Sequence, residues 1–305
     1  MGIQISFSAA DKYLLSPMQY FLHYLLKLRP IQLSSPLIFG SAIDSGLNHL
    51  LYCKKTEFKN LEQKYVIINQ KNALDSAKKN FIDTLKGSEV DYRVHGAVKF
   101  SKADLDESLL EGLDIPDGHD RAWYSLREKG LIMLEAYAEQ VLPKIKEVHA
   151  VQHEIKVTNT DGDTFIGVVD FIATMENGQK VLMDNKTTSV PYKDDAIDNS
   201  SQLASYWEIL KDEYQLDAVG FCIIPKNIRK RKEPKCEIKI MIGQVKEDLI
   251  HQTFLDYDKV LHGIKTAQFA CSGNCQKQFW KCPYQNYCAT DGKDTSGLCY
   301  QERKK

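Results

Sequence analysis

Residues 167–189 read GVVDFIATMENGQKVLMDNKTTS, and this stretch predicts a β-hairpin whose charged side chains meet on one face. Two runs of apolar and β-branched residues flank an Asn-Gly turn signal. Folding the second strand back on the first brings Asp184 opposite Asp170, which lies among apolar residues where an unpaired carboxylate is costly to bury. Lys186 shares the face of Asp184, because side chains two residues apart on a strand point the same way.

Two carboxylates and one ammonium group on a sheet face predict hydrolysis of a phosphodiester bond. Carboxylate oxygens are ligands for Mg²⁺, which polarises a phosphate and lowers the pKa of a bound water. The ammonium group of Lys186 would orient that water or stabilise charge on the phosphate. We expect Glu154, in the alternating strand 151–158, to point to the same place as a further ligand. A surface hairpin with incidental charges is the alternative interpretation.

The periodicity of the chain changes near residue 150, from helical to strand-like spacing. Before this point, the apolar pattern predicts a helix at 13–28, with Ser16 as its N-cap and Pro17 in the first turn. Further segments are expected as a helix from near Phe39, an amphipathic stretch at 59–86, a loop-rich insertion at 87–118 and a helix at 121–146. Later elements are expected as strands at 151–158, 164–174, 180–188, 218–225 and 236–245, and helices at 200–213 and 247–265.

Strands flanked by helices predict an α/β fold with a mixed sheet core. We expect a helical N-terminal region at 1–149 packed on a core at 150–266, followed by a Cys-rich metal-binding knuckle at 267–305.

The composition narrows the class of protein. The chain has 305 residues, of which 43% are apolar and 27% charged, which excludes a disordered, collagen-like or disulfide-rich small protein. Forty basic and 41 acidic residues give a net charge of −1, which excludes a polycationic coat protein but not a nuclease. No apolar run reaches the roughly 18 residues of a transmembrane helix, and no secretory pattern opens the chain. We therefore expect a soluble cytoplasmic protein that does not contact membranes.

Five of the eight cysteines fall within the last 35 residues. The segment CSGNCQKQFWKCPYQNYC (271–288) contains four thiols that could surround one metal ion, namely Cys271, Cys275, Cys282 and Cys288. In a reducing compartment such a cluster indicates metal ligation before disulfides. Cys299 is an alternative ligand, and unliganded cysteines are the other interpretation.

A basic segment, PKNIRKRKEPK (225–235), lies between two expected strands. It predicts sequence-independent contacts to DNA phosphates, whereas a solvated hairpin tip is the alternative. The candidate DNA-binding residues are Lys226, Arg229, Lys230, Arg231 and Lys232.

Several motifs together resemble the PD-(D/E)XK nuclease superfamily. Asp170 followed by Asp184-Asn185-Lys186 is similar to the signature that gives the superfamily its name, and Gln202-Leu203-Ala204-Ser205-Tyr206 is similar to the Q-x-x-x-Y helix motif of its RecB/AddB-like branch. The segment FGSAIDSGLNHLL (39–51) resembles the G-x-x-x-H segment of that branch, with Asp44 at the histidine position, as in phage-type relatives.

The resemblance implies a restriction-endonuclease-like core that hydrolyses DNA with Mg²⁺ or Mn²⁺. The implied metal ligands are Asp44, Glu154, Asp170 and Asp184, and the implied catalytic residues are Asp170, Asp184, Lys186, Gln202 and Tyr206. It further implies an exonuclease of recombination, repair or replication that acts on single-stranded DNA or duplex ends, in the host cytoplasm if phage-encoded. No P-loop of the G-x-x-x-x-G-K-[ST] type is present, so unwinding would require a helicase or recombination partner.

The tail resembles part of a known iron–sulfur staple. In RecB/AddB-type nucleases, including CRISPR-adaptation members, one N-terminal and three C-terminal cysteines hold a [4Fe-4S] cluster, and CPYQNYC (282–288) is similar to its end. Ser16 stands at the N-terminal cysteine position and Phe279 at another. Both Zn²⁺ and [4Fe-4S] therefore stay open, and zinc suits a self-contained set of four thiolates.

Two other functions are compatible with these residues. One is a non-catalytic DNA-binding or scaffold module whose Cys-ligated metal site is the functional part, and the other is a sequence-specific endonuclease. The scaffold predicts metal binding only at the thiols, whereas the endonuclease predicts discrete fragments from a plasmid.

Overall fold

The computed structural model divides the chain into two compact units. We call residues 34–153 and 168–246 the central unit, and residues 1–33, 154–167 and 247–305 the terminal unit. The structure describes residues 2–31, 33–61, 70–95, 98–100, 102, 104–116, 120–228, 235–271 and 282–300. No helix among these residues contains an apolar stretch long enough to cross a lipid bilayer.

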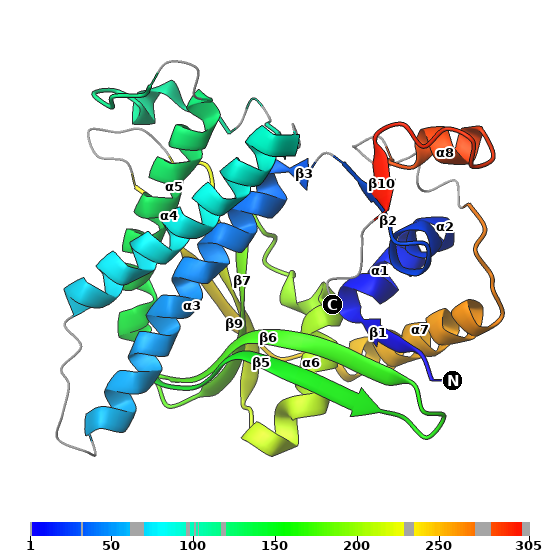
Figure 1. Ribbon diagram of the computed structural model, residues 1–305. Helices are drawn as coiled ribbons and strands as arrows, with labels where there is room; N and C mark the ends of the chain where they lie inside the picture. Colours follow the sequence, from blue (N-terminus) through cyan, green and yellow to red (C-terminus); the bar gives the residue numbers. More distant parts are fainter. Residues whose placement is uncertain are drawn as a thin grey trace. The chain divides into compact units, whose positions relative to one another are not determined.

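A mixed sheet forms the core of the central unit (Figure 1). Its strands are β5 (Ile145–Thr158), β6 (Thr164–Met175), β7 (Lys180–Thr188), β8 (Ala218–Pro225) and β9 (Lys239–Gly243). β6 and β7 are antiparallel, β7 and β8 parallel, and β8 and β9 antiparallel. The β6–β7 turn contains Gly178 at a φ of 88°, a conformation that glycine adopts without steric cost. The predicted α/β class with a mixed sheet is confirmed.

Three helices form a layer on one face of this sheet, namely α3 (Ser35–Leu61), α4 (Gln70–His95) and α5 (Arg121–Gln140). Their apolar residues share one core with β6 and β7, including Leu47, Phe81, Phe171 and Met183. Close packing of α4 and α5 requires Gly130, because a Cβ there would lie 2.0 Å from the Phe81 ring. The helices are therefore held to the sheet by a continuous apolar interface.

Helix α6 (Ser201–Tyr214) lies on the opposite face of the sheet. Met183 packs into the core shared with the helix layer, whereas its neighbour Asp184 bonds to Gln202 of α6. Since adjacent side chains on a strand point to opposite faces, both faces are covered. α6 begins at Ser200, whose hydroxyl caps it by accepting from the N–H of Leu203 at 3.2 Å.

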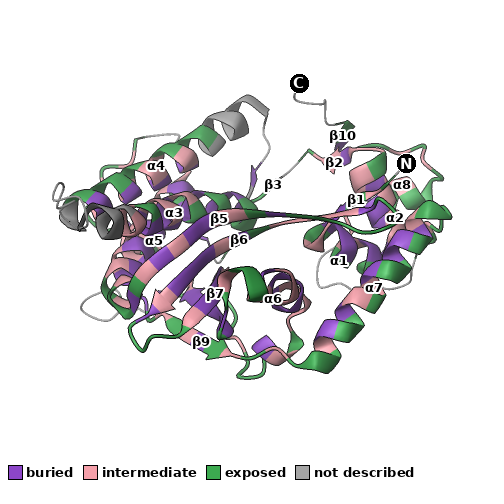
Figure 2. Ribbon diagram, turned by 90° about the horizontal axis from the view of Figure 1, so that it is seen from below, coloured by how far each residue is buried: buried purple, intermediate pink, exposed green. Residues whose placement is uncertain are grey.

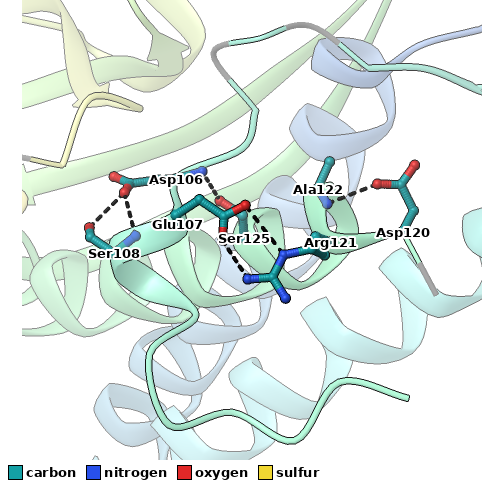
Figure 3. A network of polar contacts seen from close by, with 7 residues as sticks. All are labelled: Asp106, Glu107, Ser108, Asp120, Arg121, Ala122 and Ser125. Atoms are coloured by element: carbon teal, nitrogen blue, oxygen red, sulfur yellow. Dashed lines mark hydrogen bonds and ion pairs between the residues drawn. The ribbon is translucent and has the colours of Figure 1, made fainter. Parts of the chain in front are cut away.

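A polar network ties the segment before α5 to that helix (Figure 3). Asp120 caps α5 by accepting from the N–H of Ala122 at 2.9 Å, and Ser125 accepts from the N–H of Asp106 at 2.8 Å. Arg121 forms an ion pair with Glu107. The smaller elements here are β3 (Leu33–Ser34), β4 (Val98–Lys99) and the 3₁₀ turns Glu107–Leu109, Leu142–Lys144 and Ile197–Asn199.

The terminal unit joins both ends of the described chain. Its elements are β1 (Gln4–Ser6), α1 (Phe7–Leu15), α2 (Pro17–Tyr20), a π-helix (Phe21–Leu25), β2 (Leu28–Pro30), α7 (Glu247–Lys265), α8 (Gln285–Ala289) and β10 (Leu298–Tyr300). β1 pairs in parallel with the first residues of β6, and β2 pairs antiparallel with β10. α7 buries one stripe, including Tyr257 and Val260, and exposes the rest (Figure 2).

Two sequence predictions about helices need correction. The helix expected at 13–28 is broken, because Ser16 is both the C-cap of α1 and the N-cap of α2, with its hydroxyl accepting from Gln19 at 3.4 Å. Its predicted capping role is confirmed. The insertion expected as loop at 87–118 is helical as far as His95, since α4 is anchored by buried Phe81 and Leu85 and continues past them.

Candidate active site

The β6–β7 hairpin brings two acidic residues together. Phe171 pairs with Met183, and Asp170 and Asp184 follow immediately at the end of this paired segment. Asp184 is 4% exposed, and its Oδ2 lies 2.7 Å from Lys186 Nζ. The hairpin thus gathers the three charged side chains that the spacing predicts.

Burial changes the protonation of both carboxyl groups. Burial, with the charge of Asp184 next, raises the pKa of Asp170 to about 7. The N–H of Asn185 opposes this by donating to Asp170 Oδ2 at 2.8 Å. Burial also raises the pKa of Asp184, although the Lys186 ammonium counteracts it. Burial therefore favours the neutral form of both carboxyl groups, and the Asn185 N–H and the Lys186 ammonium compensate for this only in part.

Lys186 remains protonated between these groups. Burial is the largest single influence and lowers its pKa, but the charge and hydrogen bond of Asp184 and the charge of Asp170 act together in the other direction, and the net pKa is raised. Its ammonium group also donates to Gln202 Oε1 at 2.9 Å. A lysine so held is a fixed positive charge rather than a proton acceptor.

Helix α6 fixes these side chains from the other face. Gln202 Nε2 donates to Asp184 Oδ1 at 3.0 Å, so the same amide contacts both Asp184 and Lys186. Tyr206 lies one turn later and is 4% exposed. Burial raises its pKa, and hydrogen bonds to Gln202 and to the backbone of Val168 oppose that shift. The Q-x-x-x-Y spacing therefore places two polar side chains at the site.

Asp44 approaches from helix α3. Burial, followed by the charge of Asp184, raises the pKa of Asp44 to about 6, while Lys186 and Lys226 act in the other direction. Asn48, one turn further along α3, accepts a hydrogen bond from Gln152 Nε2 at 3.2 Å. The structure thus brings Asp44 into electrostatic contact with the hairpin residues.

Sequence reasoning missed Gln152. Its Nε2 donates to Asp170 Oδ1 at 3.2 Å, and its backbone is left-handed, with a φ of 49°. Regular strand alternation would put residues 152 and 154 on one face, and this spacing was the available signal for Gln152. Glu154 was predicted as a ligand because it is charged, whereas Gln152 is not. Glu154 is exposed and belongs to the part of β5 in the terminal unit, so its metal role stays a prediction.

The basic segment is only partly described. Lys226 lies just after β8, half-buried, with its Nζ 5.4 Å from the centre of the Phe39 ring. Burial lowers its pKa, while the charges of Asp104 and Asp44 act in the other direction. The other candidates for DNA contact, Arg229, Lys230, Arg231 and Lys232, lie outside the described residues.

The donor set fits a hard divalent cation. No three His, Cys, Asp or Glu side chains in the described ranges are close enough to enclose a metal ion. Mg²⁺, however, is usually bound by one or two carboxylates, with waters and substrate phosphates completing its shell. Asp170 and Asp184 supply such oxygens, and burial, which raises the pKa of both groups, disfavours their charged forms, which a bound cation would stabilise.

The cysteine tail belongs to the terminal unit. Cys271 and Cys288 are exposed, Cys282 is half-buried, and Cys275 lies outside the described residues. Gln19 Nε2 lies 3.4 Å from Cys282 Sγ, in hydrogen-bond geometry. Nearby, the Tyr284 hydroxyl donates to the backbone oxygen of Leu28 at 3.0 Å. These contacts place Cys282 beside α2 and Tyr284 beside β2, and metal binding in the tail stays a prediction.

Comparison with known proteins identifies the family of the chain. No curated protein matches the chain. A crystal structure of a presumed exonuclease from Eubacterium rectale is 14% identical, with a TM-score of 0.46, over 95% of this chain and 93% of that one. The model of the PD-(D/E)XK nuclease superfamily matches residues 4–289. The chain, with its restriction-endonuclease-like core, therefore belongs to the PD-(D/E)XK nuclease superfamily.

Proposed function

We propose that this nuclease hydrolyses phosphodiester bonds of DNA as an exonuclease, with Mg²⁺ or Mn²⁺. The observation that carries the proposal is the charged group formed by buried Asp184 and by the partly exposed Asp170 and Lys186, which is tied to α6 through Gln202. Replacing buried ion pairs by apolar side chains is often neutral or stabilising, so packing alone does not explain this group. A catalytic role of the β6–β7 hairpin would explain why these charged groups are gathered there.

The cation would be held by Asp170 and Asp184, with Asp44 contributing from α3 and Glu154 as a further candidate. When bound, the cation polarises the scissile phosphate and lowers the pKa of a water molecule. The carboxylates of Asp170 and Asp184 keep their oxygens fixed through Asn185 and Gln202 respectively. Little rearrangement is then needed on binding.

Lys186 acts as a fixed positive charge in the proposed mechanism. Its ammonium group has one N–H aimed at Gln202 and lies beside Asp184, which leaves a further N–H for a phosphate oxygen or the attacking water. Gln202 holds this group in place, and Tyr206 forms a hydrogen bond with Gln202 as part of the proposed catalytic set. Stabilising charge that develops on the phosphate is the expected contribution.

DNA contacts are proposed at the end of β8. Lys226 is supported by its position near Asp44, and Arg229, Lys230, Arg231 and Lys232 follow it in the chain. Tyr192, half-buried with its ring 5.6 Å from that of Phe221, lies within electrostatic range of Lys186 and offers a stacking surface. Binding through these cations would weaken steeply with salt.

The finer biology is also a proposal. The motif around Gln202 and Tyr206 supports the RecB/AddB-like branch, and Asp44 supports its phage-type members. We infer action on single-stranded DNA or duplex ends during recombination, repair or replication, in the cytoplasm, with unwinding supplied by a helicase or recombination partner. Cys271, Cys275, Cys282 and Cys288 would hold Zn²⁺ or [4Fe-4S] as a structural metal.

The test is cleavage of end-labelled single- and double-stranded DNA with Mg²⁺ or Mn²⁺. Wild-type protein is compared with Lys186→Ala and with Lys180→Ala, a matched control six residues earlier on β7. We expect a ladder from wild type and the control, and none from Lys186→Ala. Cleavage by Lys186→Ala contradicts the mechanism. Discrete fragments from a plasmid substrate would indicate a sequence-specific endonuclease. DNA binding without cleavage by any of the three proteins would indicate a scaffold module.

A further inference from the structure

The backbone at Gln152 is unusual for a strand. Its φ is 49° inside the 14-residue strand β5, a conformation that side chains other than glycine, asparagine and aspartate rarely adopt. Four other non-glycine residues in the described ranges have positive φ, and they lie in caps, turns or connections: Lys27, Gln215, Ala267 and Asp291. Strain inside a regular element persists only where its surroundings hold it, and it is common at functional sites.

The side chain of Gln152 shows what this conformation achieves. Nε2 donates to Asp170 Oδ1 at 3.2 Å and to Asn48 Oδ1 at 3.2 Å. The other oxygen of Asp170 accepts from the N–H of Asn185 at 2.8 Å. Both oxygens of Asp170 are therefore held by donors, one of which comes from the strained residue.

The second bond of Gln152 reaches helix α3. Asn48 lies four residues after Asp44, so both side chains are on the same face of that helix. The amide of Gln152 thus connects the helix that carries Asp44 to the strand that carries Asp170. A left-handed residue in a strand re-aims its side chain relative to regular alternation, as β-bulges do.

We propose that Gln152 is a positioning residue that fixes the carboxylate of Asp170 and couples it to α3 for cation binding. The amide is suited to this role because it has two N–H donors, and both are used. A carboxylate at this position would lack donors and would face Asp170 with like charge. The inference rests on the proposed function of the same site.

The test separates backbone strain from the role of the side chain. Gln152→Gly removes the amide but accepts the left-handed backbone, and Gln152→Met keeps the length without donors. Gln215→Gly and Gln215→Met are matched controls, because Gln215 is an exposed C-cap of α6 with a φ of 52°. Gln152→Asn retains an amide on a shorter chain that tolerates this backbone.

We measure kcat, KM for DNA, the Mg²⁺ concentration for half-maximal rate, and the rise of melting temperature with Mn²⁺. For Gln152→Gly we expect an unchanged or raised melting temperature in the absence of metal. We also expect at least a tenfold lower kcat, a severalfold higher Mg²⁺ requirement, a smaller shift with Mn²⁺, and a KM within twofold of wild type. Gln152→Met has the same losses, Gln152→Asn recovers part of kcat, and both Gln215 variants match wild type.

Wild-type kcat and Mn²⁺ response in Gln152→Gly overturn the proposal. The proposal is also overturned if Gln152→Gly fails to fold while Gln152→Met has normal kcat and a normal Mn²⁺ response, because the role of the residue would then be structural. A wild-type protein that neither cleaves DNA nor gains stability with Mn²⁺ overturns the proposed function, and the positioning role with it. The Mn²⁺ response therefore distinguishes the two failures.

Discussion

The carboxylate site of the central unit and the cysteine tail of the terminal unit differ in what holds their ligands. Asp170 and Asp184 lie on paired strands, and their oxygens accept hydrogen bonds from Gln152, Asn185 and Gln202, while Asp184 also forms an ion pair with Lys186. In the tail, Cys271 and Cys288 are exposed, and Cys282 Sγ lies 3.4 Å from Gln19 Nε2. The carboxylate site is held by strand pairing and by polar contacts, whereas a metal bound by the tail thiols would itself contribute folding free energy.

This difference predicts opposite costs of losing each site. Removing an oxygen ligand from a preformed catalytic site lowers the rate and leaves the fold, because the sheet and helices persist. Removing a thiol from a structural metal site lowers stability and leaves the chemistry. The following experiments test this contrast.

Asp184→Asn should have the largest effect. We expect kcat for DNA cleavage to fall by at least about 10³-fold, or about 4 kcal/mol of transition-state stabilisation, because Lys186 and the cation both lose their charged partner. Asp212→Asn, an exposed position on α6, is the matched control and should keep wild-type kcat. Single-turnover cleavage with circular dichroism makes the measurement. A folded Asp184→Asn protein that cuts within tenfold of wild type removes Asp184 from the mechanism.

Cys282→Ser should affect the other unit. We expect loss of bound zinc or iron and a melting temperature lower by about 5–10 °C, since structural metal binding contributes folding free energy. At 20 °C, kcat should stay within about threefold of wild type, in contrast to Asp184→Asn. Elemental analysis and thermal denaturation decide the outcome. Cys299→Ser, exposed in β10, should retain the metal, and full metal content in Cys282→Ser would reject the tail site.

Gly130→Ala tests the packing behind the catalytic hairpin. A Cβ at residue 130 would lie 2.0 Å from the fully buried Phe81 ring, so we expect a loss of about 1–3 kcal/mol of unfolding free energy. Gly87→Ala on α4 has no neighbour within 4 Å and should gain about 0.5–1 kcal/mol from helix propensity. Urea denaturation measures both. Equal stability of the two variants would mean that α4 and α5 pack less closely than described.

Local patterns predicted much of the catalytic hairpin. Apolar runs on both sides of an Asn-Gly turn specify the two strands, and strand alternation then puts Asp184 and Lys186 on one face. Helical spacing likewise puts Gln202 and Tyr206 together. These features depend on residues close in the chain, where the rules of one element suffice.

Long-range contacts explain what remained beyond prediction. The strained φ of Gln152 has no local signal, because it is maintained by Asn48 and Asp170, which lie 104 and 18 residues away. The N-cap at Ser16 was predicted, but not that the same residue also ends α1, because the helical spacing continues across both helices. Sequence identified the chemical groups, and tertiary packing determined which of them meet.

The smallest expected effect is a pH dependence that has opposite sign in the two units. Burial raises the pKa of Asp170 to about 7 in the folded, metal-free protein. Between about pH 4 and 7, the folded state therefore holds a proton on Asp170 that the unfolded state does not hold. Stability from this group is therefore lost as pH rises. In the terminal unit, burial lowers the pKa of His23 to about 4, so its unfolded form binds the extra proton below about pH 6.5. Stability is there lost as pH falls.

Two variants separate these contributions to unfolding free energy in metal-free buffer. Ionisation of Asp170 between pH 5 and 7 lowers the unfolding free energy of the wild-type protein. Asp170→Asn removes this loss, so its change in unfolding free energy from pH 5 to 7 should be more positive than that of wild type by about 1–2 kcal/mol. His23 Nδ1 lies 2.9 Å from the Tyr284 hydroxyl, and His23→Gln keeps a polar partner for that hydroxyl. In this variant the change in unfolding free energy from pH 5 to 7 should be more negative than in wild type by about 1 kcal/mol, a value reduced for partial solvent exposure. Urea denaturation at both pH values tests the signs. If Asp170→Asn leaves the pH dependence unchanged, Asp170 ionises normally and the buried, preformed character of the carboxylate site is wrong.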